Sequence, residues 1–249
     1  MMLTNYVKLT DADEGDYFYK EEIKKLRANI VFTGRKYKKI MFTSCFQGEG
    51  KSDTVFHLAV DMTKLGKRVL LIDADIRNSQ YVTRFAVNQQ VLGLSEYLSG
   101  QIDEVNQIFY QTNYDNLFLI FSGAYASNPS EMLADESFGR LLTAAAESFD
   151  YIFVDTPPLG QIIDAAQIGR FCDGAIIVIE SGAVSYRAAQ KVKKQLDQAD
   201  IHILGVALNK VDRAAAGAYG HYGKYGKYGK YGKYGKYGRY GYDKSAQTE

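Results

Sequence analysis

The stretch that decides the fold is "KIMFTSCFQGEGKS", residues 39–52. Its apolar start suits a strand buried on both faces, and Gly48 and Gly50 follow at once. Glycines let backbone N–H groups approach phosphate oxygens, Lys51 can reach the β- and γ-phosphates of a nucleotide, and Ser52 can ligate Mg²⁺. Because the stretch runs directly into a helical pattern, it predicts a strand–loop–helix phosphate site. A glycine-containing turn that binds nothing is the less favoured reading.

Short apolar runs and longer helical patterns alternate along the rest of the chain. Further strands are expected at residues 68–74, 116–121, 151–155, 174–179 and 203–208. Amphipathic helices are expected at residues 129–149 and 185–198, and a third from residue 51 to a stop at Gly66. The apolar stripe of the third helix consists of Val55, Leu58, Ala59, Met62 and Leu65. This alternation predicts an α/β fold like that of P-loop NTPases, with a mostly parallel sheet and helices on both faces. Ligands of such sheets lie beyond the carboxyl ends of the strands.

Acidic residues end two of the expected strands. Asp73 and Asp75 end "LLIDADIR", and Asp155 ends "YIFVD". Each could simply cap the next element, but three acids beside a phosphate loop predict one shared site over Mg²⁺ or its water shell. No histidine pairs with a nucleophile, so His57 is expected to be packed, and Cys45 is expected to be a packing residue.

Composition limits the remaining possibilities. With 249 residues, 46% of them hydrophobic, the chain can bury one sizeable core. The net charge of +1 gives no general case for a nucleic-acid partner, and none is expected. Two distant cysteines predict neither a disulfide framework nor a zinc site. The sequence shows no signal peptide and no apolar run of about 20 residues, so a cytoplasmic location is expected.

The chain ends in a tyrosine-rich tract, "YGKYGKYGKYGKYGKYGRYGY", residues 222–242. It has no continuous apolar face to offset its ordering entropy, so a disordered tail is expected. The tract lacks proline, which argues against a collagen-like helix, whereas binding to single-stranded nucleic acid is a minor alternative. The expected organisation is an N-terminal arm and helix at residues 1–32, a P-loop domain at 33–213 and the tail at 214–249.

Taken together, these motifs resemble the bacterial tyrosine kinases (BY-kinases) of capsule and exopolysaccharide synthesis, in the separate cytoplasmic form of Gram-positive organisms. The likeness is carried by "GEGKS", by "LLIDADIR" as the Walker A′ motif, by "FVDTPP" as the Walker B strand and by the tyrosine cluster. Further matches at residues 21–32, 93–100 and 128–133 extend the likeness over nearly the whole chain. The family has Thr and Asn at the places of Asp53 and His57, and an acid at Asp53 would weaken nucleotide binding.

The resemblance implies a non-specific protein-tyrosine kinase that uses ATP and Mg²⁺ and phosphorylates its own tail. Lys51, Asp73, Asp75 and Asp155 would be catalytic, and Mg²⁺ would be held by Ser52 and the same three acids. The roles of Asp73 and Asp75 are not separated. Nucleotide-binding residues would be Gln47, Gly48, Glu49, Gly50, Lys51, Ser52, Asp53 and Asn209, the last as an adenine contact. The phosphoacceptors would be Tyr219, Tyr222, Tyr225, Tyr228, Tyr231, Tyr234, Tyr237, Tyr240 and Tyr242.

The family also implies partners. Glu21, Lys24 and Arg27 occupy the places of a Glu-x-x-Arg-x-x-Arg pattern that docks subunits into a ring. A membrane-spanning chain-length regulator would activate the kinase and attach it peripherally to the membrane, and a cognate phosphotyrosine phosphatase would reverse its action. Two alternatives stay open: a Min- or Par-type positioning ATPase and a weakly active nucleotide-binding scaffold. The tyrosine tract, and Phe46 where the positioning ATPases carry a lysine, favour the kinase.

Overall fold

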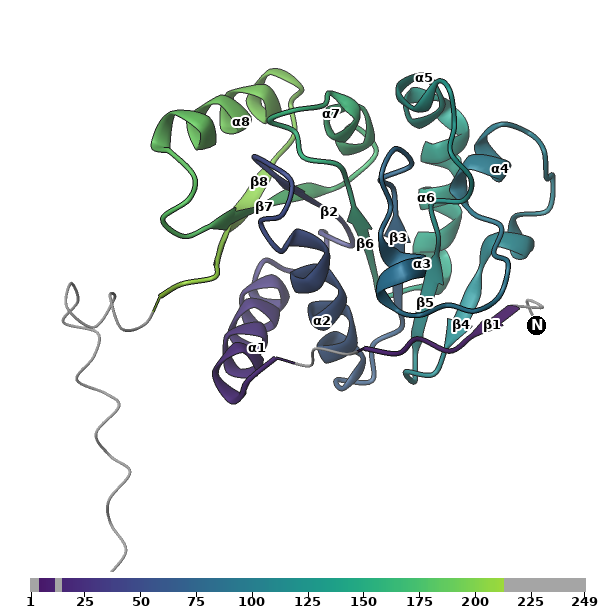
Figure 1. Cartoon of the computed structure of the whole chain (residues 1–249), viewed down its shortest axis with the longest axis horizontal. Helices are drawn as coiled ribbons and strands as arrows, with labels where there is room; N and C mark the ends of the chain where they lie inside the picture. The colour runs from purple at the N-terminus through teal and green to yellow at the C-terminus, as the bar shows by residue number, and fades with distance from the viewer. Residues whose placement is uncertain (1–4, 12–14, 213–249) are drawn as a thin grey trace, which may run out of the picture. The chain divides into compact units, whose positions relative to one another are not determined.

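The computed structural model describes residues 5–11 and 15–212. Its centre is an eight-stranded sheet of order β1-β4-β5-β3-β6-β2-β7-β8 (Figure 1). Every neighbouring pair is parallel except β4 and β5. The strands are β1 (Asn5–Val7), β2 (Lys39–Ser44), β3 (Val69–Asp73), β4 (Tyr110–Thr112), β5 (Leu117–Ile120), β6 (Tyr151–Asp155), β7 (Gly174–Glu180) and β8 (Ile203–Asn209). The predicted mostly parallel α/β fold is confirmed.

Helices cover both faces of the sheet. They are α1 (Tyr17–Phe32), α2 (Lys51–Thr63), α3 (Tyr81–Arg84), α4 (Leu94–Leu98), the 3₁₀ helix η1 (Val105–Ile108), α5 (Pro129–Ala134), α6 (Glu136–Ser148), α7 (Asp164–Gly169) and α8 (Tyr186–Gln198). One apolar cluster joins the sheet to α1 and α2, and a second joins the opposite face to α5, α6, α7 and α8. This alternation of faces follows from the strands, because neighbouring residues such as Ile40 and Met41 belong to different clusters.

Three details differ from the sequence expectations. Leu65 is 48% exposed, because α2 ends at Thr63 and Leu65 lies past its last turn. The pattern at residues 129–149 forms two helices, since Asp135 has an extended backbone and caps α6 by accepting from the backbone N–H of Ser137. Strands β1 and β4 were not expected. Each has only three residues, too few for a recognisable alternation.

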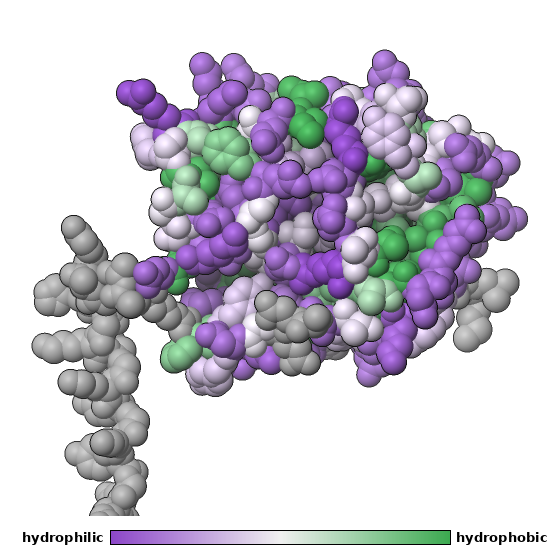
Figure 2. Space-filling view, viewed as in Figure 1, coloured by the Kyte–Doolittle hydropathy of each residue, from purple (hydrophilic) through white to green (hydrophobic). Residues whose placement is uncertain are grey.

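The surface gives little sign of a large apolar interface on the face shown in Figure 2. That face is predominantly hydrophilic, and its apolar residues form small separate groups. No helix within residues 5–11 and 15–212 has the length and apolarity to cross a bilayer. The predicted tail, residues 214–249, lies outside the described residues, and the three-part division of the chain stays a prediction.

Candidate functional site

The loop between β2 and α2 is shaped by two glycines in the left-handed backbone region. Gly48 has a φ of 85° and Gly50 has a φ of 76°. At Gly50 a side chain is also excluded by space, since a Cβ atom would lie 2.2 Å from Nδ2 of Asn209. Lys51 and Ser52 then open α2, so the unpaired N–H groups of the helix face the loop. This is the nest of backbone donors that a phosphate group requires.

The loop is held from its outer side by residues at the ends of β7 and β8. Asn209 Nδ2 donates to the carbonyl of Glu49 at 2.9 Å, and Lys210 Nζ donates to the carbonyl of Gly48 at 2.6 Å. The buried carboxylate of Glu49 accepts from the backbone N–H groups of Phe46 at 2.5 Å and Glu180 at 3.1 Å. Burial raises the pKa of Glu49, and these hydrogen bonds oppose the rise.

A second group of side chains, the buried acid cluster, lies at the carboxyl ends of β3 and β6. It consists of Asp73, Asp155, Lys51, Ser79 and Tyr81. Asp73 and Asp155 are register partners on neighbouring strands, and each is 1% exposed. Lys51 Nζ forms an ion pair with Asp155, whose other oxygen accepts from the Tyr81 hydroxyl at 3.0 Å. The hydroxyl of Ser79 donates to Asp73. The predicted convergence of Lys51 with the two strand-end acids is therefore present.

Two acids at the end of β3, Asp73 and Asp75, have no ion pair within the part of the chain that the structure describes. Burial raises the pKa of Asp73 to about 7; the Ser79 hydrogen bond opposes the rise, and the charge of Asp155 adds to it. Asp75 is half-buried, and its pKa is also raised by burial, although the charge of Lys51 opposes the change. Carboxyl groups with perturbed pKa values beside a phosphate loop are typical of a catalytic site.

The donor atoms suit a magnesium ion only in part. In residues 5–11 and 15–212, no three or more His, Cys, Asp or Glu side chains are arranged to hold a metal ion. Mg²⁺ prefers oxygen ligands, keeps several waters and usually binds through one or two carboxylates together with substrate phosphates. The hydroxyl of Ser52 and the carboxylates of Asp73, Asp75 and Asp155 are oxygen donors of this kind. They fit Mg²⁺ as partners of a bound phosphate chain, not as a complete protein cage.

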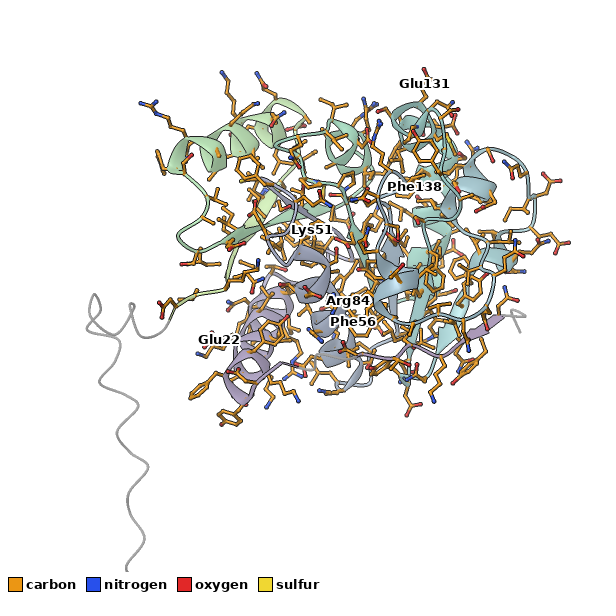
Figure 3. The ribbon with its side chains drawn as sticks, viewed as in Figure 1. Glu22, Lys51, Phe56, Arg84, Glu131 and Phe138 are labelled. Atoms are coloured by element: carbon orange, nitrogen blue, oxygen red, sulfur yellow. The ribbon has the colours of Figure 1, made fainter. Side chains whose placement is uncertain are left out.

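A third group, the surface charge network, joins the early turns of α2 to α3 and to the segment after β1. It consists of Asp11, Asp53, His57 and Arg84. Arg84 forms an ion pair with Asp53 and lies 3.8 Å from a carboxylate oxygen of Asp11. Asp11 also contacts His57 Nε2 at 2.8 Å, and the guanidinium of Arg84 lies 5.8 Å from the ring centre of Phe56 (Figure 3). The acid at residue 53 thus has a cationic partner inside the chain.

The AAA domain family matches residues 37–204. The tyrosine-protein kinase CpsD of Streptococcus agalactiae is 40% identical over 196 residues, which cover 79% of this chain and 84% of CpsD. The chain belongs to the bacterial tyrosine kinases.

Solved structures agree with this membership. The kinase domain of Escherichia coli tyrosine kinase ETK is 31% identical, with a TM-score of 0.74, over 78% of this chain and 76% of that one. The septum site-determining protein MinD of Pyrococcus horikoshii, complexed with Mg-ADP, is 22% identical, with a TM-score of 0.59, over 72% of this chain and 75% of that one. The likeness to MinD shows the shared fold alone. The enzyme class expected from the sequence, a protein-tyrosine kinase, is confirmed.

Other sequence-predicted residues of the kinase lie in several environments. Gln47 is exposed, Cys45 is fully buried, and burial raises the pKa of its thiol to about 11, as suits a packing residue. His57 is half-buried, with its ring between Asp11 and the Tyr19 hydroxyl. Asn209 meets the loop backbone, and its adenine contact stays a prediction. The nine predicted phosphoacceptors, Tyr219 to Tyr242, lie outside the described residues.

Residues predicted to join subunits lie on α1. Lys24 pairs with Glu21 on the same helix at 2.7 Å, and both side chains are exposed. Arg27 instead pairs with the buried carboxylate of Asp61 on α2 at 2.9 Å. In the kinase chain, Arg27 therefore has a structural role in attaching α1 to α2. The ring contact stays a prediction.

Sequence reasoning missed four residues that shape the kinase site: Ser79, Tyr81, Arg84 and Lys210. Ser79 follows the acidic strand closely enough to have been suspected as a partner of Asp73. Tyr81 is the first residue of α3, a helix of four residues, and nothing in its neighbourhood distinguishes it from a core aromatic residue. Arg84 and Lys210 reach α2 and the loop from distant parts of the chain, and only the fold brings them there.

Proposed function

We propose that the chain is an ATP- and Mg²⁺-dependent kinase that phosphorylates the tyrosines of its own C-terminal tract. The observation that carries this proposal is the meeting of Lys51, Asp73 and Asp155 at the carboxyl ends of β3 and β6, beside a glycine-shaped loop. The loop N–H groups and Lys51 would bind the phosphates of ATP. Mg²⁺, when bound, would neutralise charge on the phosphate oxygens near Ser52 and the strand-end acids.

The chain's acids would serve the proton transfer. A tyrosine hydroxyl has a pKa near 10, so it attacks the γ-phosphorus efficiently only when a carboxylate accepts its proton. The new bond joins the phenolic oxygen to the γ-phosphorus, while the bond to the bridging oxygen breaks and ADP leaves. We assign the proton to Asp73, since its raised pKa of about 7 lets it hold a proton at neutral pH. Asp75, which is half-buried, would face the substrate side.

Membership in the kinase family supports a wider role in the control of capsule or exopolysaccharide synthesis. In this role a membrane-spanning regulator would bring the kinase to the membrane, and a phosphatase would remove its phosphates. The unmodified cationic tract would favour a ring in which each tract enters the neighbouring site. Each phosphotyrosine adds about −1.5 to −2 charges, so progressive modification would make the tract anionic and dissolve the ring. An unchanged sedimentation coefficient in fully phosphorylated protein would contradict this last step.

The function is tested by incubating the purified chain with Mg-ATP and mapping phosphotyrosine by mass spectrometry. We expect phosphate on Tyr219 to Tyr242 and a loss of at least about 100-fold in Lys51→Met. The Lys51→Met chain should still be modified when it is mixed with the parent, because transfer occurs between subunits. A variant with all nine tyrosines changed to phenylalanine serves as the acceptor control. ATP hydrolysis without phosphotyrosine would instead indicate a positioning ATPase.

A further inference from the structure

Two carbonyl groups of the phosphate loop accept hydrogen bonds from side chains at the end of β8. Asn209 and Lys210 are consecutive, and they hold the consecutive carbonyls of Glu49 and Gly48. Strand pairing puts them there, because Asn209 is the register partner of Glu180 at the end of β7. Lys210 Nζ also contacts the Glu180 carboxylate at 2.8 Å, so its position is fixed from two sides.

The backbone at Lys210 indicates that this placement is imposed by its surroundings. Its φ is 53°, in the left-handed region that a residue with a long side chain seldom adopts. Such conformations persist where the surrounding structure over-determines them, and they cluster at functional sites. A lysine placed only for solubility at the end of a strand would have no reason to adopt it.

The hydrogen bonds from Asn209 and Lys210 fix the orientation of two peptide groups of the loop. A trans peptide is planar, and its C=O and N–H groups point in opposite directions. When Lys210 holds the Gly48 carbonyl on the outer side, the N–H group of Glu49 must point the other way. Asn209 imposes the same on the peptide between Glu49 and Gly50. These inward N–H groups belong to the nest that cradles the α- and β-phosphates of a nucleotide.

We propose that Lys210 is a positioning residue for nucleotide binding, which fixes the Gly48–Glu49 peptide so that its N–H group faces the phosphates. The residue does not touch the transferred phosphoryl group. Its amine is used by the Gly48 carbonyl and by Glu180, and its side chain is 47% exposed on the outer side of the loop. This inference rests on the proposed ATP-dependent function and adds a residue that the sequence motifs do not include.

The experiment measures the affinity of fluorescently labelled ADP and ATP for the full chain, with and without Mg²⁺. Lys210→Met keeps the length of the side chain and removes its charge and donors. We expect it to weaken both nucleotides by about fivefold to tenfold, since a charge-assisted hydrogen bond that orders the nest is lost. In steady state the KM for ATP should rise by the same factor, while kcat stays within about twofold. Lys210→Arg, which can still donate to a carbonyl, should recover most of the affinity.

Lys193→Met is the matched control. Lys193 pairs with Asp197 on the same helix, α8, at 2.6 Å and forms no ion pair with the described residues of the loop, so its variant should lose no nucleotide affinity. Affinity within about twofold of the parent in Lys210→Met, or an equal loss in Lys193→Met, would overturn the proposal. A loss confined to ATP would also overturn it, because it would show a direct contact with the γ-phosphate. If the parent chain binds neither nucleotide, the proposed function itself fails, and the two failures are thereby separated.

Discussion

Two groups of charged side chains adjoin α2, and they differ in burial and in ion pairing. The buried acid cluster sets Asp73 and Asp155 against Lys51 in a setting almost without solvent. The surface charge network sets Asp53 and Asp11 against Arg84 and His57, and its Asp53 side chain is 52% exposed. In the first group Asp73 has no ion pair within the part of the chain that the structure describes, whereas each acid of the second has a cationic or ionisable partner.

This difference indicates at which positions the chain can depart from the residues of its family. The cluster holds three residues of the family motifs, Lys51, Asp73 and Asp155, and burial there raises the pKa of Asp73 to about 7. The network holds Asp53 and His57, two positions of α2 that depart from the family pattern, and Arg84 forms an ion pair with the acid there. Asp73 and Asp75, two of the proposed catalytic residues, thus have no ion pair within the part of the chain that the structure describes, whereas the unusual acid of the phosphate-loop helix, Asp53, has one with Arg84. Substitutions at Asp73, Arg84, Asp53 and Tyr81 test this contrast.

Asp73→Asn should have the largest effect, because it removes the uncompensated charge and the proposed proton acceptor together. Loss of a general base lowers the rate by about 100-fold or more. The free energy of unfolding, in contrast, should increase at neutral and alkaline pH. Folded Asp73 keeps its proton up to about pH 7, while the unfolded residue releases it near 3.8, so the folded protein binds more protons between these values. The parent therefore loses stability as pH rises through this window, and the Asn variant does not.

Thermal melts measure this second effect. We expect the Tm advantage of Asp73→Asn over the parent to be at least about 5 °C larger near pH 8 than near pH 5, since about 1 kcal/mol corresponds to 2–4 °C in a domain of this size. Asp150→Asn is the control, since the pKa of Asp150 is lowered by hydrogen bonding to the backbone of Arg68. A Tm difference for Asp73→Asn that is the same at both pH values would show that the carboxyl group carries no buried charge.

Most of the buried acid cluster was predictable from sequence, whereas the surface charge network was not. Asp73 and Asp155 end apolar runs, and parallel strands bring such ends to one edge of the sheet. Six of the eight strands were predictable for the same reason. Arg84 was not, because it is the last residue of a four-residue helix whose position relative to Asp53 depends on packing. Sequence periodicity carries no information about which charged side chains meet across different elements.

Arg84→Gln should have an intermediate effect, because it leaves Asp53 without its partner beside the phosphates. At the effective dielectric constant of a protein surface, an unpaired charge several ångströms from a polyanion costs about 1 kcal/mol, or about a fivefold loss of nucleotide affinity. Asp53→Thr alone should tighten binding by up to about threefold, since Arg84 then offers a net positive charge. Titration of labelled ADP measures both changes.

The double variant decides the interpretation. If Arg84 acts by neutralising Asp53, the Arg84→Gln, Asp53→Thr chain should bind ADP within about twofold of the parent. A double variant as weak as Arg84→Gln would mean that Arg84 acts through Asp11 or through its stacking on Phe56. Weakening that disappears at high salt would further support an electrostatic cause, since exposed charges are screened.

Tyr81→Phe should have the smallest effect and should fall on stability alone. The Tyr81 hydroxyl donates to Asp155 at 3.0 Å, and the side chain is 2% exposed, so its loss leaves a buried carboxylate oxygen with one donor fewer. A net cost of about 1 kcal/mol lowers Tm by about 3 °C, and nucleotide affinity should stay within about twofold. Tyr97→Phe is the control, because the Tyr97 hydroxyl makes no hydrogen bond to the part of the chain that the structure describes. Equal Tm values for the two variants would show that Asp155 is held by Lys51 alone, and the buried cluster would then depend on a single ion pair.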